Sequence, residues 1–222
     1  MALVTVFLLL QLLLALALNE EIECTGNDGG WLRNEYSPVQ EEESCTVERR
    51  DGSITYAEFI EQYAYRRPVI LQGITDNSEF RTLCRKDHLL KTYGDHLVRL
   101  STANTYSYEK VDVPFQEYVE HWLRPQDPKT LGCDTLYFFG DNNFTEWGSL
   151  FQKYIPPPFK LPGTTGAYSF GVAGSGTGVP FHWHGPGFSE VIYGRKVLYF
   201  PDRWWHATLN LDTSVFISTF LG

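Results

Sequence analysis

Three histidines near the C-terminal end of this 222-residue chain constrain its fold more than any other feature. His182 and His184 are separated by one residue, and a third histidine closes the segment Trp204-Trp205-His206. Alternate residues of a β-strand point to the same face, so the first two histidines share a face if their segment is extended. The third can reach them only from a second strand alongside. The pattern therefore predicts a small β-barrel with a metal at its mouth, held by His182, His184 and His206.

Glycine, proline and polar residues around these histidines sharpen the prediction. From Gly176 to Asn210 the sequence reads G-x5-H-x-H-x5-E-x3-G and then P-x4-H-x3-N. This spacing resembles the paired motifs of the cupin superfamily, and residues 168–222 resemble JmjC-domain proteins, which are typically Fe(II)- and 2-oxoglutarate-dependent oxygenases. The resemblance implies a JmjC-like cupin domain over residues 52–222. It also implies that Lys196 stands where the family places the lysine that binds the 2-oxoglutarate carboxylate.

The ligand set departs from that family in one position. An Fe(II) oxygenase of this class holds its metal with two histidines and one carboxylate, but here the middle position is His184. A neutral imidazole in place of an anion favours Zn or Cu over Fe(II). The cofactors implied by the resemblance are Fe(II) and 2-oxoglutarate, with Zn as the alternative metal and a site without any cofactor as a further alternative.

The spacing departs from the family as well. Only four residues separate Lys196 from Pro201, whereas two further strands and a turn need on the order of 12 residues. The chain is therefore predicted to lack an internal segment of the JmjC domain. Residues 191–200, VIYGRKVLYF, read as one nearly continuous β-prone run. If they form one strand, Lys196 and Val197 point to opposite faces.

The N-terminal end predicts entry into the secretory pathway. Residues 2–18 form an apolar run that would span roughly 25 Å as a helix, short of the ~30 Å hydrocarbon core. Ala15-Leu16-Ala17 provides an A-x-A cleavage site, so residues 1–18 are predicted to be a signal peptide. An uncleaved anchor is the alternative, and only then is the membrane a partner. Residues 19–51 form an acidic lead-in.

Further features fit an oxidising compartment. Asn143-Phe144-Thr145 is a glycosylation sequon in a turn-like stretch. An even number of cysteines is compatible with two disulfides, although three pairings are possible. The four candidates are Cys24, Cys45, Cys84 and Cys133. The resemblance implies residence in the endoplasmic reticulum lumen. Nucleic acid is excluded as a partner by the net charge of −9, because no run of Lys or Arg exceeds two residues.

Periodicity predicts an α+β, mainly β fold. Thr55 opens a capping box for a helix that ends before Pro68, and short strands are expected at 69–72 and 136–139. Further helices are expected from 87 to 94 and from Pro114. From residue 167 onward the sequence is mostly β. The architecture expected is an N-terminal helical and mixed layer on a C-terminal partial double-stranded β-helix, the cupin or jelly-roll form.

Two functions from different classes fit these patterns. The first is a non-catalytic regulatory or adaptor protein that binds a protein partner through strand edges left open by the missing segment. The second is a 2-oxoglutarate oxygenase that hydroxylates a protein, with Lys196 binding the cosubstrate. The missing carboxylate favours the first. Glu190 and Asn210 are expected to be structural rather than ligating.

Overall fold

The computed structural model describes residues 28–31, 45–102, 109–125 and 136–222. The predicted signal peptide, most of the acidic lead-in, Cys24 and Cys133 lie outside the described residues. In the described part of the chain, no helix is long and apolar enough to cross a membrane.

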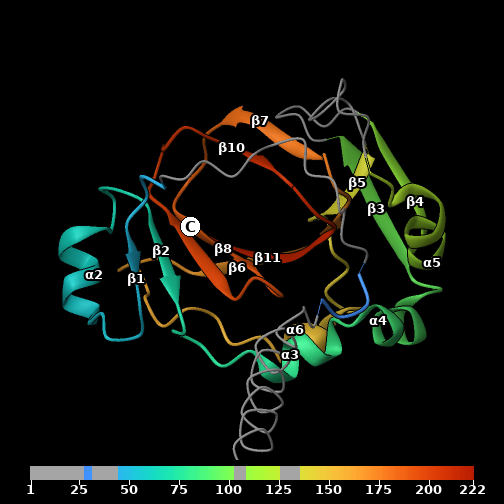
Figure 1. Ribbon diagram of the computed structural model, residues 1–222, viewed down its shortest axis with the longest axis horizontal. Helices are drawn as coiled ribbons and strands as arrows, with labels where there is room; N and C mark the ends of the chain where they lie inside the picture. The colour runs from blue at the N-terminus through green and yellow to red at the C-terminus, as the bar shows by residue number, and fades with distance from the viewer. Residues whose placement is uncertain (1–27, 32–44, 103–108, 126–135) are drawn as a thin grey trace, which may run out of the picture.

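The described strands form one large sheet and one small sheet (Figure 1). The large sheet contains, in chain order, β1 (Arg49–Arg50), β2 (Val69–Gln72), β3 (Leu97–Thr102), β4 (Lys110–Pro114), β5 (Leu136–Phe139), β6 (Gly166–Ala173), β8 (Gly187–Val191), β9 (Lys196–Phe200) and β11 (Ser214–Leu221). The small sheet pairs β7 (Gly178–His182) with β10 (His206–Leu209).

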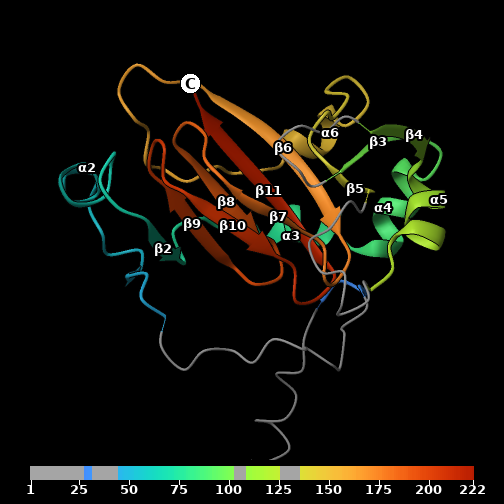
Figure 2. The same ribbon diagram turned by 90° about the horizontal axis from the view of Figure 1, so that it is seen from above.

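The large sheet is curved, and the small sheet lies across its concave side. Its strand order is β1-β2-β9-β8-β11-β6-β5-β3-β4, and every pair except β1 with β2 is antiparallel. Figure 2 shows β10 and β7 crossing over the strands of the large sheet. This confirms the predicted partial double-stranded β-helix, in which the described part of the smaller sheet contains only two strands.

Residues 191–200 form a hairpin rather than one strand. Val191 pairs with Lys196 across a turn at residues 192–195, and β9 then pairs on its other side with β2. Ile192 is buried at the start of the turn, and Arg195 takes a positive φ of 50° at its end. The single-strand reading was wrong because burial of Ile192 and pairing with β2 both favour a reversal of the chain.

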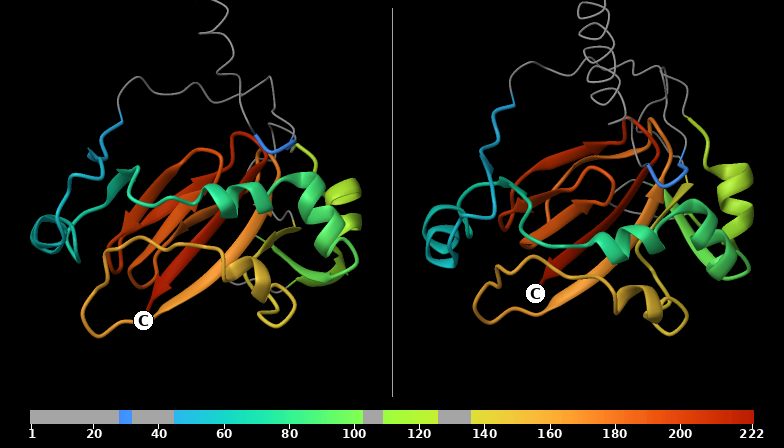
Figure 3. Two further views of the ribbon diagram at one scale, coloured as in Figure 1. Left: turned by 90° about the horizontal axis from the view of Figure 1, so that it is seen from below. Right: turned by 60° about the horizontal axis from the view of Figure 1, so that its bottom comes forward.

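Short helices cover the outside of the large sheet. They are α2 (Tyr56–Gln62), α3 (Ser78–Leu83), α4 (Lys86–Tyr93), α5 (Phe115–Glu117), which continues as the π-helix η1 (Tyr118–Trp122), and α6 (Gly148–Phe151). The predicted capping box is confirmed, since Thr55 Oγ1 accepts from the Glu58 N–H at 3.2 Å and the Glu58 carboxylate accepts from the Thr55 N–H at 2.8 Å. Figure 3 shows α3 and α4, in green, beneath the sheet, with α2 at its far end.

The core has two main aromatic clusters. In the larger one, Trp147 stacks on Tyr93 at 4.3 Å between ring centroids and meets Phe115 edge-on at 5.5 Å. In the second, Phe59 of α2 stacks on Phe159 at 4.6 Å and contacts the underside of β8 and β9. Full burial of each such ring stabilises the fold by about 1.5–3 kcal/mol, so helices and sheet hold each other in place.

Two of the four cysteines lie in the described part of the chain. Cys45 and Cys84 both have free thiols. Cys84 ends α3 and is fully buried, with its carbonyl accepting a 3.0 Å hydrogen bond from Trp31 Nε1, whereas Cys45 is exposed. One thiol is thus enclosed in the core and the other faces solvent. The described residues contain no disulfide, and pairing among the four cysteines stays a prediction because Cys24 and Cys133 lie outside the described residues.

Candidate metal centre

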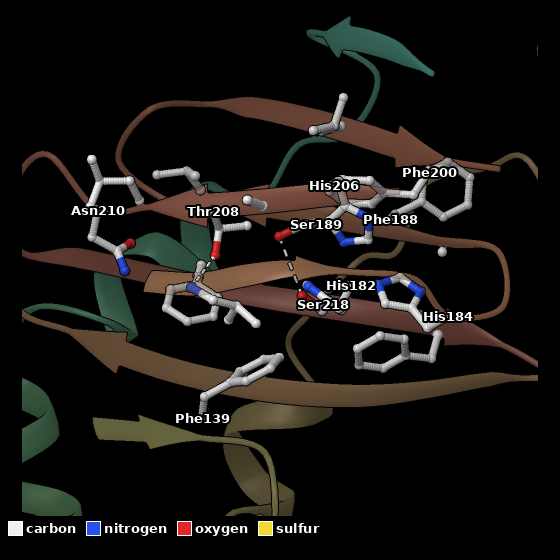
Figure 4. A pocket seen from close by; sticks show the side chains of 18 of the residues that line it. Phe139, His182, His184, Phe188, Ser189, Phe200, His206, Thr208, Asn210 and Ser218 are labelled. Carbon is white, nitrogen blue, oxygen red and sulfur yellow. Dashed lines mark hydrogen bonds between the residues drawn. The ribbon is translucent and has the colours of Figure 1, made fainter. Parts of the chain in front are cut away.

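The three histidines converge where β7 ends and β10 begins. His182 is the last residue of β7 and is the register partner of His206, the first residue of β10, while His184 follows two residues after β7. The possible ligand atoms of all three lie within 4.8 Å of one another. Ring centroids of His182 and His206 are 4.3 Å apart, and those of His184 and His206 are 4.8 Å apart. Figure 4 shows the three rings together on one wall of a cavity.

Each ring is oriented by a backbone carbonyl from its own segment. His182 Nδ1 lies 2.9 Å from the Pro180 carbonyl, His184 Nδ1 lies 2.6 Å from the Gly185 carbonyl, and His206 Nδ1 lies 2.8 Å from the carbonyl of Trp204. A carbonyl can only accept, so each Nδ1 carries the proton and donates it. The lone pair then resides on Nε2 in all three rings. A hydrogen bond donated by the other ring nitrogen in this way fixes the tautomer and orientation of a histidine and prepares it for metal binding.

Aromatic neighbours pack against two of these rings, and burial disfavours their charged form. Phe200 stacks on His206 at 4.4 Å between centroids, and Phe220 meets His184 edge-on at 5.1 Å. Burial lowers the pKa of both His184 and His206 below the usual 6.5, and His182 lowers the pKa of each further. Both imidazoles are therefore neutral at neutral pH, which is the form that binds metal.

A cavity of about 450 Å³ lies beneath the histidines, between the small sheet and the large one. Its wall is mostly apolar, with a few hydroxyl groups such as Ser189 and Ser218, whose oxygens are 3.3 Å apart. Lys196 lines the same cavity together with Leu198 and Phe200, the residues that share its face of β9. Val197 and Tyr199 face the core cluster on the other side. The structure thus places Lys196 and the three histidines around one space.

No Asp or Glu is among the described residues that line this cavity. Glu190 of β8 points to the opposite face, where Asn77 Nδ2 donates to its carboxylate at 3.1 Å and Tyr154 donates at 3.1 Å. Asn210 donates to the Thr177 carbonyl at 3.1 Å and ties the ends of the small sheet together. Both residues are structural, as expected. The donor set therefore does not fit an Fe(II) facial triad, and it fits a metal that accepts three imidazoles.

The predicted glycosylation site is exposed. Asn143 follows β5 in a turn, and its Oδ1 accepts from the backbone N–H of Thr145 at 3.1 Å. This geometry leaves the sequon on the surface of the described part of the chain. Modification of Asn143 stays a prediction.

An apolar surface beside the small sheet was not predicted from the sequence. Large aromatic side chains beside the inward histidines are exposed to solvent. This outer aromatic surface consists of Phe181, Trp183, Trp204 and Trp205. The signal was present in the sequence for three of them, because Phe181, Trp183 and Trp205 are each adjacent to a histidine whose direction had been predicted.

Comparison with known proteins supports the family suggested by the histidine motifs. The chain is 60% identical to JmjC domain-containing protein 8 of Mus musculus and 61% identical to that of Homo sapiens, covering 88% of this chain and 90% of each relative. This chain belongs to the JmjC domain-containing protein family. A plant relative, lysine-specific demethylase JMJ21 of Arabidopsis thaliana, is 29% identical over 50% of this chain and 11% of its own length. No family model matches the sequence.

The same comparisons support the missing segment. The alignments with the two mammalian relatives extend over 243 and 240 residues, more than the 222 residues of this chain. The relatives therefore contain residues inside the matched region that this JmjC protein lacks.

Among solved structures, the chain is similar to YcfD of Escherichia coli, with a TM-score of 0.48 and 14% identity over 77% of this chain and 53% of YcfD. A second YcfD structure, described as a ribosomal oxygenase with cobalt and succinic acid, matches with a TM-score of 0.43 and 16% identity over 77% of this chain and 52% of YcfD.

Proposed function

We propose that this chain is a non-catalytic JmjC protein of the secretory pathway, in the endoplasmic reticulum lumen, which acts as a regulatory or adaptor protein through direct contact with a protein partner. The observation that carries this proposal is the outer aromatic surface on a two-stranded sheet with open edges. Among the described residues that line the cavity on the other side of the same sheet, none supplies the carboxylate that oxygen activation by Fe(II) needs. Binding of a protein partner, rather than catalysis, is the function that this part of the molecule supports best.

The size of the outer aromatic surface fits a binding site. Phe181 is 72% exposed and Trp205 is 62% exposed, while Trp183 and Trp204 are each nearly half exposed. At about 150–250 Å² for a whole aromatic side chain, these four residues together expose roughly 500 Å² of apolar area. That is at the upper end for a monomer and approaches the ~800 Å² that one side of a stable interface buries.

The strand edges indicate the kind of partner. Among the described strands, β7 and β10 pair only with each other, so each has a free outer edge. An extended peptide can add to such an edge through backbone hydrogen bonds while its alternate side chains contact the aromatic rings. We infer a partner that presents an extended, apolar segment.

Residence in the secretory pathway rests on separate features. The apolar residues 2–18, which end in the A-x-A motif, support entry, and exposure of the sequon at Asn143 supports access by a glycosyltransferase. Expression in a secretory host should give a glycosidase-sensitive mass increase that Asn143→Gln abolishes. An unchanged mass for the unsubstituted chain would argue against lumenal residence.

The interaction is tested by replacing its surface. A chain with Phe181→Ser and Trp205→Ser should lose most partner capture in chemical crosslinking from secretory-pathway extracts, whereas Leu97→Ser should not. Leu97 is a matched control because it is 60% exposed on β3, away from the small sheet. His182→Ala should also retain capture. Loss of capture on His182→Ala with capture retained in the double variant would show that the cavity, not the outer surface, makes the contact.

The second candidate is an oxygenase that hydroxylates a protein, and Lys196 favours it. Its presence in the same cavity as the histidines would suit a charge-assisted contact with the carboxylate of 2-oxoglutarate. This function predicts succinate release coupled to loss of 2-oxoglutarate in metal-loaded protein, abolished by Lys196→Ala. Folded, metal-loaded protein without that turnover would exclude it.

A further inference from the structure

The metal preference of the histidine cluster can be inferred from its donors alone, independently of the adaptor proposal. Three neutral imidazoles leave the full charge of a divalent ion uncompensated, because no carboxylate lies among the described cavity-lining residues. Fe(II) sites with open positions use two histidines and a carboxylate, whereas imidazole donors suit Zn and Cu. Three histidines plus one exchangeable ligand is an established zinc arrangement. The ligand chemistry therefore points away from iron.

The geometry supports four-coordinate binding. Nitrogens bound at 2.0–2.1 Å in a tetrahedron lie roughly 3.3 Å apart. The three histidine ligand atoms already lie within 4.8 Å of one another, so modest ring rotation would bring them to that spacing. The carbonyls of Pro180, Gly185 and Trp204 keep Nδ1 occupied, which leaves Nε2 of each ring for the metal. No further side chain of the described cavity wall supplies a fourth strong donor for the tetrahedron.

The surroundings indicate what the fourth position accepts. All three histidines line the cavity, so a fourth ligand would lie inside it. A dication held by neutral donors, with Lys196 on the same wall and no acidic side chain among the described lining residues, gives this space a positive potential. Most of the wall is apolar and would exclude a large hydrated ligand. A small anion satisfies these conditions.

We infer that His182, His184 and His206 form a zinc site rather than an iron site, with a fourth position that opens into the cavity and binds a small anion. The assignment concerns this chain's own donor set and does not depend on any catalysed reaction.

Metal competition tests the preference of the three histidines for zinc over iron. Protein purified from a secretory host and stripped with a chelator should bind one Zn²⁺ per chain by mass spectrometry of metals. Anaerobic titration should give a dissociation constant for Fe²⁺ at least about ten-fold weaker than for Zn²⁺. His206→Ala should abolish stoichiometric zinc, whereas the exposed His121→Ala should not. Tighter Fe²⁺ than Zn²⁺, or zinc retained in His206→Ala, would overturn the assignment.

A reciprocal variant keeps the test decisive if His206→Ala misfolds. His184→Asp restores the two-histidine, one-carboxylate set and should move the preference toward Fe²⁺ by about ten-fold or more. For the unsubstituted chain, zinc at 100 times its dissociation constant should raise the melting temperature by roughly 5–10 °C. A native circular dichroism spectrum without this shift would show that the histidines do not bind zinc.

Cobalt substitution tests the open position. Co²⁺ in place of zinc should give visible absorption bands typical of low coordination number, and these should shift when azide is added. Lys196→Gln should weaken azide binding about five-fold through loss of the cavity's positive charge, whereas Arg195→Gln, in the exposed turn, should leave it unchanged. Cobalt bands that do not respond to azide would show that the fourth position is closed.

Discussion

Replacing Glu190 tests whether burial or hydrogen bonding dominates the pKa of the buried carboxyl group behind the cavity wall. Glu190 is 3% exposed on β8 and accepts hydrogen bonds from Asn77 and Tyr154. Burial raises its pKa above the ordinary 4.5, whereas the bonds from Asn77 and Tyr154 and the more distant Arg81 lower the pKa by smaller amounts. The net pKa is raised, so the charged form is costly despite its partners.

The two substitutions at this position should differ in size. Glu190→Ala leaves the buried Tyr154 hydroxyl without this acceptor, whereas Asn77 Nδ2 retains the Ile155 carbonyl at 3.0 Å. One buried donor without this partner, together with the space left by the removed atoms, should cost about 2–4 kcal/mol. Glu190→Gln keeps the shape and one acceptor oxygen, so it should cost less than about 1 kcal/mol at neutral pH.

The pH dependence has a definite sign. Because the pKa of Glu190 in the folded protein lies above 4.5, the folded chain binds this proton more tightly than the unfolded chain does. The stability that the group contributes is complete below pH 4.5 and is lost as the pH rises through the raised pKa. A folded-state pKa that is one pH unit higher corresponds to about 1.4 kcal/mol in the free energy of unfolding. The unsubstituted protein should therefore lose stability relative to Glu190→Gln as the pH rises.

Urea unfolding of both proteins at intervals between about pH 4 and 8 measures this difference directly. Subtracting the two curves removes the contributions of other carboxyl groups that the proteins share. Glu61→Gln, at an exposed position of α2, is the matched control and should give no such trend. If the unsubstituted protein instead gains stability relative to Glu190→Gln with rising pH, hydrogen bonding outweighs burial and the reasoning is refuted.

Three further predictions concern the rest of the chain. Thr55→Ala removes the capping box of α2 and should lower the free energy of unfolding by about 1 kcal/mol in urea. Iodoacetamide should modify Cys45 in the native protein but reach Cys84 only after unfolding, as peptide mass spectrometry would show, since Cys84 is fully buried and burial raises the pKa of its thiol. Gly178→Ala would place a methyl group against the Thr208 carbonyl, and it should destabilise the protein by about 1–3 kcal/mol and weaken zinc binding by separating β7 from β10.

Local features of the fold were predictable from the sequence. The capping box at Thr55 and the short strands β2 and β5 lie at the residues where their motifs and β-prone runs predicted them. These signals involve residues close together in the chain, so residues that are distant in the sequence have little influence on them. The strands β3 and β4 and the helix α3 were not predicted. Their short runs carry no strong periodicity and are stabilised by pairing and packing across the sheet.

The candidate site, like the fold, was predictable from the sequence only in its local features. The sequence by itself determined which residues could bind a metal, that the usual carboxylate is absent, and that His182 and His184 share a face, because strand alternation and donor chemistry are local properties. Only the tertiary structure decided that β10 pairs with β7, that Lys196 lines the same cavity, and that the neighbouring aromatic rings face solvent. Those outcomes depend on contacts between segments far apart in the chain, and on which strands the shortened domain retains to cover the large sheet.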